Sequence, residues 1–350
     1  MGKIKIGFAG VGYMGQVAHL RNYLRNPDCE VVAIAEPRAE LARRVAEKYG
    51  IPRIYQNHLE LAEDKDVQAV VASQPFLLNG FITIPLLQAG KNCFIEKPMA
   101  GSLEEAEEMV RAARDSNVLI MLGFMKRYDS GVARAKEFLD RVYVSGEFGE
   151  PGLVNAYCFG GDWTRQIEGP ISTDEPFPKN PGFTPKQPTW MTDAQKDTFN
   201  LYMNIFSHNV NLVRYLFPKK LEVRTAVLRE RSMTQSTVLE GDGVIVNLYG
   251  MGVSTGWWEE RTEIYFSNGW VRVLTPSPLA VQDSATVEIY HAGKVQETRV
   301  LRGKPYWAFR AQADHFIECL KENKSPRTNG EECLEDMRLM EDAFRKAQWV

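Results

Sequence analysis

Three glycines near the start of the chain have the spacing of a dinucleotide-binding turn. Gly10, Gly12 and Gly15 form the pattern Gly-x-Gly-x-x-Gly between a strand-like and a helix-like run. In that context the first glycine permits a tight turn, the second lets the backbone approach a pyrophosphate, and the third lets the helix pack closely on the strand. Glu36 ends the next strand, about twenty residues further on, where a carboxylate binds the adenosine ribose hydroxyls. Two residues between the glycines are expected to line the same site: Tyr13 and Met14.

The carboxylate of Glu36 favours NAD as the cofactor, because it would repel the 2′-phosphate of NADP. Arg38 leaves an alternative open, since an arginine near the ribose can stack on adenine or hold that phosphate.

A lysine and a histidine later in the chain have the residue types and positions for acid–base chemistry. Lys97 follows Glu96 at the carboxyl end of a buried strand, where ligand sites of α/β sheets lie. An ammonium there can stabilise a developing alkoxide or help to relay its proton. His208 lies on a predicted helix whose polar residues at positions 204, 208, 211 and 215 share one face, as in a helix that faces a substrate cleft. The alternative to a catalytic role is a surface position for Lys97, and a hydrogen-bonded position in the core for His208.

Together, the glycine pattern, the segment Phe94-Ile-Glu-Lys-Pro-Met-Ala100 and the histidine resemble the glucose–fructose oxidoreductase / inositol dehydrogenase (Gfo/Idh/MocA) family. The resemblance covers essentially the whole chain. It implies that Lys97 polarises the substrate oxygen, that His208 is the general base, and that Pro98 has an unusual bond geometry. Asn204 stands where the family usually has an aspartate, and an amide cannot accept a relayed proton.

The same resemblance suggests further ligand contacts. The loop under the cofactor would be Ser73, Gln74 and Pro75, with Asn79 where a histidine is common and Glu96 beside the catalytic lysine. The resemblance also suggests substrate contacts from Arg127 and Tyr128. Trp163 and Arg165 are expected to contact substrate for another reason, because aromatic faces beside polar groups suit carbohydrate rings. For Arg127 a salt bridge at a domain hinge is the alternative. The proline-rich and aromatic loop from Trp163 to Trp190 is interpreted as either a substrate lid or an oligomer contact.

The residues of the predicted cofactor site follow different strands, so they can meet only if the carboxyl ends of those strands lie at one edge of a sheet. The first part of the chain alternates strand and helix signals, as such a parallel sheet requires. The expected strands are 3–9, 30–35, 69–73, 92–95 and 119–123, and the expected helices are 13–25, 38–49, one that ends at residue 90, and 103–116, with Ser102 and Glu105 as a capping box. We therefore predict an α/β Rossmann domain over residues 1–123.

Residues 124–350 have a different rhythm. Helices are expected at 131–139, 198–216, 306–321 and 331–347, and strands at 153–159, 221–228, 244–249, 262–266, 270–274, 286–290 and 295–301. This pattern predicts an α+β domain with a large, mostly antiparallel open sheet, whose closing helices can pack back on the first domain.

The composition limits the classes of partner. The 350 residues are 44% hydrophobic and 25% charged with a formal net charge of -3, which argues against nucleic acid or an anionic membrane as the main partner. No apolar run reaches the roughly 18 residues that span a bilayer, and the first strand leaves no room for a signal peptide. The five cysteines are odd in number and widely spaced, and no trio of residues has zinc-ligand spacing. We expect a cytoplasmic protein with buried thiols and no metal centre.

The most specific hypothesis is an NAD-dependent oxidoreductase acting on a secondary hydroxyl of a sugar, sugar derivative, glycoside or cyclitol. Two alternatives remain: a redox-neutral epimerase or glycoside-cleaving enzyme that forms a transient ketone, and a non-catalytic NAD or sugar sensor. We also expect a homodimer or homotetramer formed through the second-domain sheet, whose uncovered face would present Trp257, Trp258, Tyr265 and Trp270.

Overall fold

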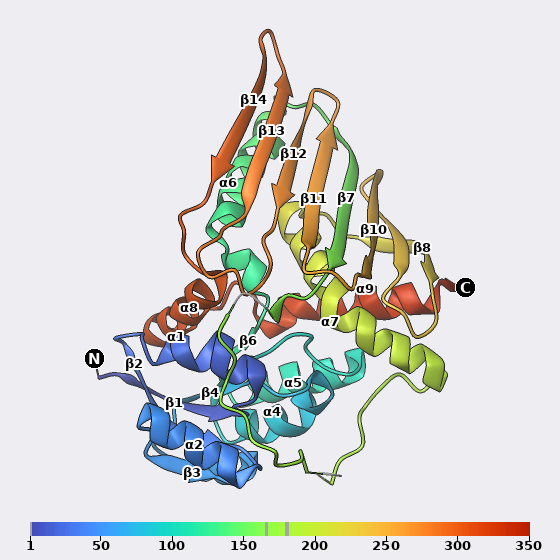
Figure 1. Cartoon of the computed structure of the whole chain (residues 1–350). Helices are drawn as coiled ribbons and strands as arrows, with labels where there is room; N and C mark the ends of the chain where they lie inside the picture. Colours follow the sequence, from blue (N-terminus) through green and yellow to red (C-terminus); the bar gives the residue numbers. More distant parts are fainter. Residues whose placement is uncertain (1, 165–166, 179–181) are drawn as a thin grey trace. The chain divides into compact units, whose positions relative to one another are not determined.

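The computed structural model describes residues 2–164, 167–178 and 182–350, and the chain divides into two compact units (Figure 1). The first unit comprises Met1–Gly123, Glu168–Pro188 and Phe309–Met337, and the second comprises Phe124–Ile167, Thr189–Ala308 and Arg338–Val350. Two stretches that follow residue 124 in the sequence, 168–188 and 309–337, therefore cluster with the first unit.

The first unit contains a six-stranded parallel sheet in the order β3-β2-β1-β4-β5-β6. Its strands are β1 (Ile4–Ala9), β2 (Cys29–Ala35), β3 (Arg53–Tyr55), β4 (Ala69–Ala72), β5 (Asn92–Ile95) and β6 (Ile120–Leu122). This is the Rossmann strand order. The succession of strands across the sheet reverses between β1 and β4, and sheets of this kind bind ligands at the carboxyl ends of their strands near that point. The predicted Rossmann fold is confirmed. The edge strand β3 was not predicted because three residues carry too little pattern.

The helices of this unit begin and end where local chemistry requires it. They are α1 (Arg21–Tyr23), α2 (Ala39–Tyr49), α3 (His58–Glu63), α4 (Asn79–Gln88), α5 (Leu103–Asp115), α8 (Ala308–Glu322) and α9 (Gly330–Arg345), the last two extending into the second unit. The α5 helix starts at Ser102, whose hydroxyl accepts from the Glu105 N–H. The Glu105 carboxylate accepts from the Gly101 N–H, one residue before the partner that a capping box uses.

The helix after the glycine turn differs from the single helix expected over 13–25. Its central part, Gly15–Leu20 (η1), is a π-helix, and α1 ends at Tyr23. All six residues of the π-helix are buried. The hydrophobic periodicity therefore gave no sign of the wider turn.

The second unit contains a nine-stranded sheet in the order β14-β13-β12-β11-β7-β10-β9-β8-β15. Its strands are β7 (Pro151–Gly160), β8 (Glu222–Leu228), β9 (Gln235–Gly241), β10 (Val244–Gly252), β11 (Trp258–Phe266), β12 (Gly269–Leu274), β13 (Thr286–Ala292), β14 (Gln296–Arg302) and β15 (Ala347–Trp349). The pairs β7–β10 and β8–β15 are parallel and the others antiparallel, so the predicted mostly antiparallel sheet is confirmed. Two strands were missed, β9 and β15, the second because the last helix ends at Arg345 rather than at residue 347.

Two helices pack on one face of this sheet (Figure 1): α6 (Ser130–Ser145) against β12, β13 and β14, and α7 (Asp193–Leu216) against β7 and β11. The α7 helix begins five residues earlier than the expected residue 198, at a capping box made by Thr192 and Gln195. The other face of the sheet carries stacked aromatic side chains. The rings of Tyr157 and Tyr249 are 5.3 Å apart, and the Arg272 guanidinium lies 3.9 Å from the centre of the Trp270 ring.

Trp258 is not on that face with Tyr265, as the sequence suggested. The two residues are an odd number of positions apart in β11, so their side chains point to opposite sides of the sheet. The Trp258 ring instead lies 5.9 Å from the Lys126 ammonium. Trp257 precedes the strand and is exposed, whereas Tyr265 and Trp270 face each other across β11 and β12.

The expectation of buried thiols is confirmed, because all five cysteines are buried and none forms a disulfide. None of the helices in the described part of the chain is long and apolar enough to cross a membrane.

Candidate active site

The glycine turn follows β1 and has one open position. Gly10 has a φ of +85°, and a Cβ there would lie 2.6 Å from the Ser73 carbonyl oxygen. A Cβ on Gly15 would lie 2.7 Å from the Gly10 carbonyl oxygen. At Gly12 the nearest atom is a guanidinium nitrogen of Arg38, at 3.6 Å. Packing within the protein therefore explains the first and third glycines, whereas the second leaves room for a close ligand, as a pyrophosphate site requires.

Glu36, directly after β2, is buried and held in place by its own unit. Its side chain is 2% exposed, and its carboxylate accepts from the Val11 backbone N–H at 3.1 Å. The other carboxylate oxygen pairs with Nε of Arg38 at 2.7 Å. Glu36, the residue predicted to bind the ribose, is thus already paired with Arg38, the residue that made NADP an alternative to NAD.

Asn79 holds the turn that carries the lysine. It is fully buried, and its Nδ2 donates to the carbonyl oxygens of Glu96 at 2.9 Å, Pro98 at 2.8 Å and Met99 at 3.2 Å. Its Oδ1 accepts from Nε2 of Gln74 at 2.7 Å. Its amide therefore joins the loop after β4 to the turn after β5. The Oε1 atom of Gln74 is buried without a hydrogen-bond partner among the described residues, so the loop has an acceptor available for a ligand.

A second buried histidine, to which the sequence analysis assigned no role, supports the same turn. His19 is 1% exposed, and its Nε2 lies 2.6 Å from Oε1 of Glu96. The second carboxylate oxygen of Glu96 accepts from the backbone N–H of Lys97 at 3.0 Å, and the Lys97–Pro98 peptide bond is cis. Lys97 thus lies between Glu96 and Pro98, both of which are held by buried hydrogen bonds. The available signal was the place of His19 on the helix that follows the glycine turn.

The histidine of the second unit lies in the middle of α7. His208 is 8% exposed, and its ring meets Phe124 edge-on with the ring centres 6.1 Å apart. The predicted polar stripe is not uniform, because Asn204 is exposed while Asn211 is buried. Leu201, at the apolar position one helical turn earlier than Ile205, is exposed as well. The buried face of the first half of α7 instead consists of Phe199, Tyr202, Met203 and Phe206.

An ion pair next to His208 was missed from the sequence. Asn209 donates to the Glu260 carboxylate of β11 at 3.2 Å, and Lys126 forms a short ion pair with the same oxygen. All three residues are buried. Charges buried in this way are stable only when paired and hydrogen-bonded, so the three side chains join η3 (Met125–Tyr128), α7 and β11.

The remaining predicted substrate residues lie in different surroundings. Arg127 is buried, donates to the Asn211 carbonyl oxygen at 2.9 Å and lies 5.1 Å from the Tyr215 ring, so it contacts α7. Tyr128 is buried and Trp163 half-buried in the second unit. Arg165 lies outside the described residues.

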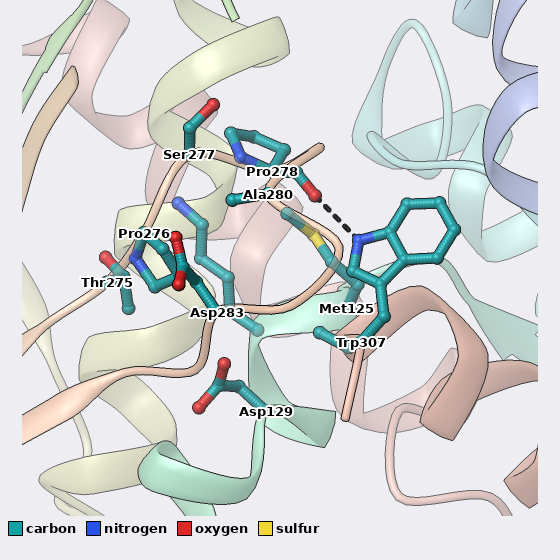
Figure 2. A pocket seen from close by; sticks show the side chains of 11 residues that line it. Met125, Asp129, Thr275, Pro276, Ser277, Pro278, Ala280, Asp283 and Trp307 are labelled. Carbon is teal, nitrogen blue, oxygen red and sulfur yellow. Dashed lines mark hydrogen bonds between the residues drawn. The ribbon is translucent and has the colours of Figure 1, made fainter. Parts of the chain in front are cut away.

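A small pocket in the second unit lies beside the buried lysine (Figure 2). Residues of η3, the 275–283 segment and Trp307 line it, and the Trp307 Nε1 donates to the Pro278 carbonyl oxygen at 3.0 Å. Its volume of about 20 Å³ is room for about one water molecule. It is too small for a sugar ring.

One acidic group brings potential metal ligands together. Among the described residues, ligand atoms of Glu332, Cys333 and Asp336 on α9 lie within 4.8 Å of one another. The Cys333 thiol donates to the Glu332 carboxylate at 3.5 Å. The group contains no histidine; Cys333 and Asp336 are buried, and Glu332 is half-buried.

The first part of the chain is similar to known proteins. A family model described as an oxidoreductase family with an NAD-binding Rossmann fold, GFO_IDH_MocA, matches residues 4–124. The scyllo-inositol 2-dehydrogenase (NAD(+)) of Bacillus subtilis is 30% identical over 150 residues, which is 43% of this chain and 42% of that enzyme. The myo-inositol 2-dehydrogenase of Thermotoga maritima is 28% identical over 219 residues, 63% of this chain and 56% of that enzyme. The chain thus spans about half the length of these curated relatives.

Solved structures resemble the chain over almost its full length. A 3-ketoreductase from Actinomadura kijaniata, in complex with TDP-benzene and NADP, has a TM-score of 0.76 at 21% identity and covers 99% of both chains. The aldose-aldose oxidoreductase of Caulobacter crescentus has a TM-score of 0.75 at 20% identity, with 98% and 97% covered. At such identities the likeness shows the fold alone. Residues 4–124 are thus similar to the NAD-binding Rossmann domain that the Gfo/Idh/MocA oxidoreductase family model describes.

Proposed function

We propose that this protein is an NAD-dependent oxidoreductase that acts on a secondary hydroxyl of a sugar, sugar derivative, glycoside or cyclitol. The observation that carries the proposal is the turn at residues 96–99, which buried hydrogen bonds from Asn79 and His19 fix at the carboxyl end of β5. A lysine on so rigid a turn is suited to hold one substrate oxygen in a defined position. The names of the inositol dehydrogenases among the relatives support a polyhydroxylated substrate.

Residues of the first unit would hold the dinucleotide. The open position at Gly12 suits the pyrophosphate, the pair of Glu36 and Arg38 suits the ribose, and the loop at Ser73, Gln74 and Pro75 follows β4 at the switch point of the sheet. The bound nicotinamide would supply the redox chemistry by taking up or giving back a hydride.

Side chains of the protein would carry out the proton transfer and stabilise the charge that develops on the substrate oxygen. We assign His208 as the base that takes the hydroxyl proton, and Lys97 as the group that stabilises the developing alkoxide. Asn204, one helical turn before the histidine, can orient an imidazole but cannot accept its proton. Arg127 would keep α7 in place through the Asn211 carbonyl oxygen.

A screen of sugars, glycosides and cyclitols with NAD, followed by NADH absorbance and by mass spectrometry of the products, tests the proposal. Accumulation of NADH with an oxidised product supports it. A new product without NADH would indicate a redox-neutral cycle instead, and binding without any product would indicate a sensor.

A further inference from the structure

The segment 168–178 crosses the nucleotide-binding motifs within the first unit. Ile171 pairs with the side chain of Gln16, which follows the glycine turn: the Ile171 N–H donates to Oε1 at 2.9 Å, and Nε2 donates to the Ile171 carbonyl oxygen at 3.0 Å. The same Nε2 donates to the Val11 carbonyl oxygen within the turn at 2.7 Å. Arg44 of α2 donates to the Ser172 carbonyl oxygen at 3.1 Å. These contacts fix the segment against both the glycine turn and α2.

Glu175 of this segment caps the helix that follows the ribose-binding strand. Its two carboxylate oxygens accept from the backbone N–H groups of Glu40 at 3.0 Å and Leu41 at 2.9 Å, and Thr173 donates to it at 3.2 Å. The N-cap residue itself, Arg38, makes no side-chain cap. The N-terminus of α2 therefore depends on a carboxylate from a segment distant in sequence. The hydrogen bond from the Glu40 backbone is the largest cause that lowers the pKa of Glu175, so the group carries its charge at neutral pH.

The arginine next to the ribose-binding carboxylate is already paired. Arg38 is paired with the buried Glu36 at 2.7 Å, and its guanidinium lies 5.7 Å from the ring of Phe177 in the same segment. A 2′-phosphate binds beside the ribose, near such an arginine. Here it would add about two negative charges beside the carboxylates of Glu36 and Glu175. Arg38 already pairs with Glu36, and Arg44 donates to the Ser172 carbonyl oxygen.

We propose that Glu175 is a specificity-determining residue, whose carboxylate occupies the anion position at the N-terminus of α2 and thereby selects NAD over NADP. The inference rests on the proposed function, since it concerns the same dinucleotide. A helix N-terminus attracts anions through its unpaired N–H groups and its dipole. Because Glu175 already uses those N–H groups, the 2′-phosphate meets a like charge instead of two donors.

The test is calorimetric titration of the full chain with NAD and with NADP, in wild type and three variants. Glu175→Gln keeps the size and removes the charge, and Glu175→Asp keeps the charge. Asp174→Asn is the matched control, because it removes a carboxylate that is exposed, neighbours Glu175 and has no contact with α2 among the described interactions. Thermal unfolding of each variant verifies that it is folded.

We expect wild type to bind NAD at least about tenfold more tightly than NADP. In Glu175→Gln the ratio of the two dissociation constants should fall about tenfold, mainly because NADP binds more tightly once one partly screened charge is removed. Glu175→Asp and Asp174→Asn should keep the wild-type ratio. Equal changes in both affinities would show that Glu175 is only a helix cap and overturn the inference, as would a wild type that prefers NADP. Binding of neither dinucleotide by folded wild type would overturn the proposed function itself.

Discussion

The amide of Asn79 is the most informative single perturbation, because it supports the lysine turn without being able to reach solvent. Asn79→Ala removes three donated hydrogen bonds and one accepted bond at a fully buried position. Each buried carbonyl that loses its partner costs about 1–3 kcal/mol, and relaxation of the turn recovers part of this. We therefore expect the free energy of unfolding of the first unit to fall by about 3 kcal/mol.

The same substitution should lower turnover more than it lowers dinucleotide affinity. The turn at 96–99 positions Lys97, and a displacement of about 1 Å at a reacting group can cost about a hundredfold in rate. The assays are denaturant unfolding, calorimetric titration with NAD, and turnover per folded molecule on the substrate found by screening. We expect turnover to fall at least about tenfold while the dissociation constant for NAD changes by less than about threefold.

Two comparison variants make this reasoning refutable. Asn79→Asp has nearly the same size but places acceptors where the amide donates, so it should be at least as harmful as Asn79→Ala. Asn57→Ala removes the exposed N-cap of α3, where the side chain accepts from Leu59 and Glu60, and should cost about 1 kcal/mol without lowering turnover. Wild-type stability in Asn79→Ala, or wild-type turnover in Asn79→Asp, would show that the amide does not hold the turn.

Three further predictions address other parts of the molecule. Lys97→Met and His208→Ala should each lower turnover by roughly two to four orders of magnitude with NAD affinity little changed, and near-normal turnover in either variant refutes the assigned role. Burial raises the pKa of Asp129, which caps α6, so its contribution to stability is present at low pH and is lost as the pH rises through the folded pKa. Asp129→Asn keeps an accepting oxygen without the charge, and its unfolding free energy should match wild type below about pH 4 and exceed it at neutral pH, whereas a difference independent of pH would contradict this. The aromatic face of the nine-stranded sheet should join two copies of the chain, so light scattering should show at least a dimer that Trp270→Asp weakens, and a monomeric wild type at micromolar concentration excludes this.

The sequence was sufficient for the elements whose pattern is local. The Rossmann strands and the antiparallel sheet follow from alternation and apolar runs. Gly10 and Glu36 directly follow β1 and β2, and Lys97 lies two residues after the end of β5. What could not be predicted depends on contacts between distant segments. The sequence places His19 on the helix after the glycine turn but does not indicate that it meets Glu96, and nothing around Glu175 indicates that it caps α2. The wrong side assigned to Trp258 has a different origin. The predicted strand began at residue 262, so the alternation of faces was not extended back to Trp258, where β11 begins.

The distinction between residues that the protein needs and residues that a ligand needs can be made position by position. The folded chain accounts for Gly10 and Gly15, because a side chain at either would collide with backbone atoms of the same unit. It does not account for Gly12, where a Cβ would meet nothing closer than 3.6 Å. The loop after β4 offers a second such case, because the buried Oε1 of Gln74 has no hydrogen-bond partner among the described residues although its amide nitrogen is used. Gly12 follows β1 and Gln74 follows β4, the two strands between which the strand order reverses. A dinucleotide bound there would account for both positions: its pyrophosphate would need the close approach that Gly12 allows, and it would offer a hydrogen-bond donor to the buried Oε1 of Gln74.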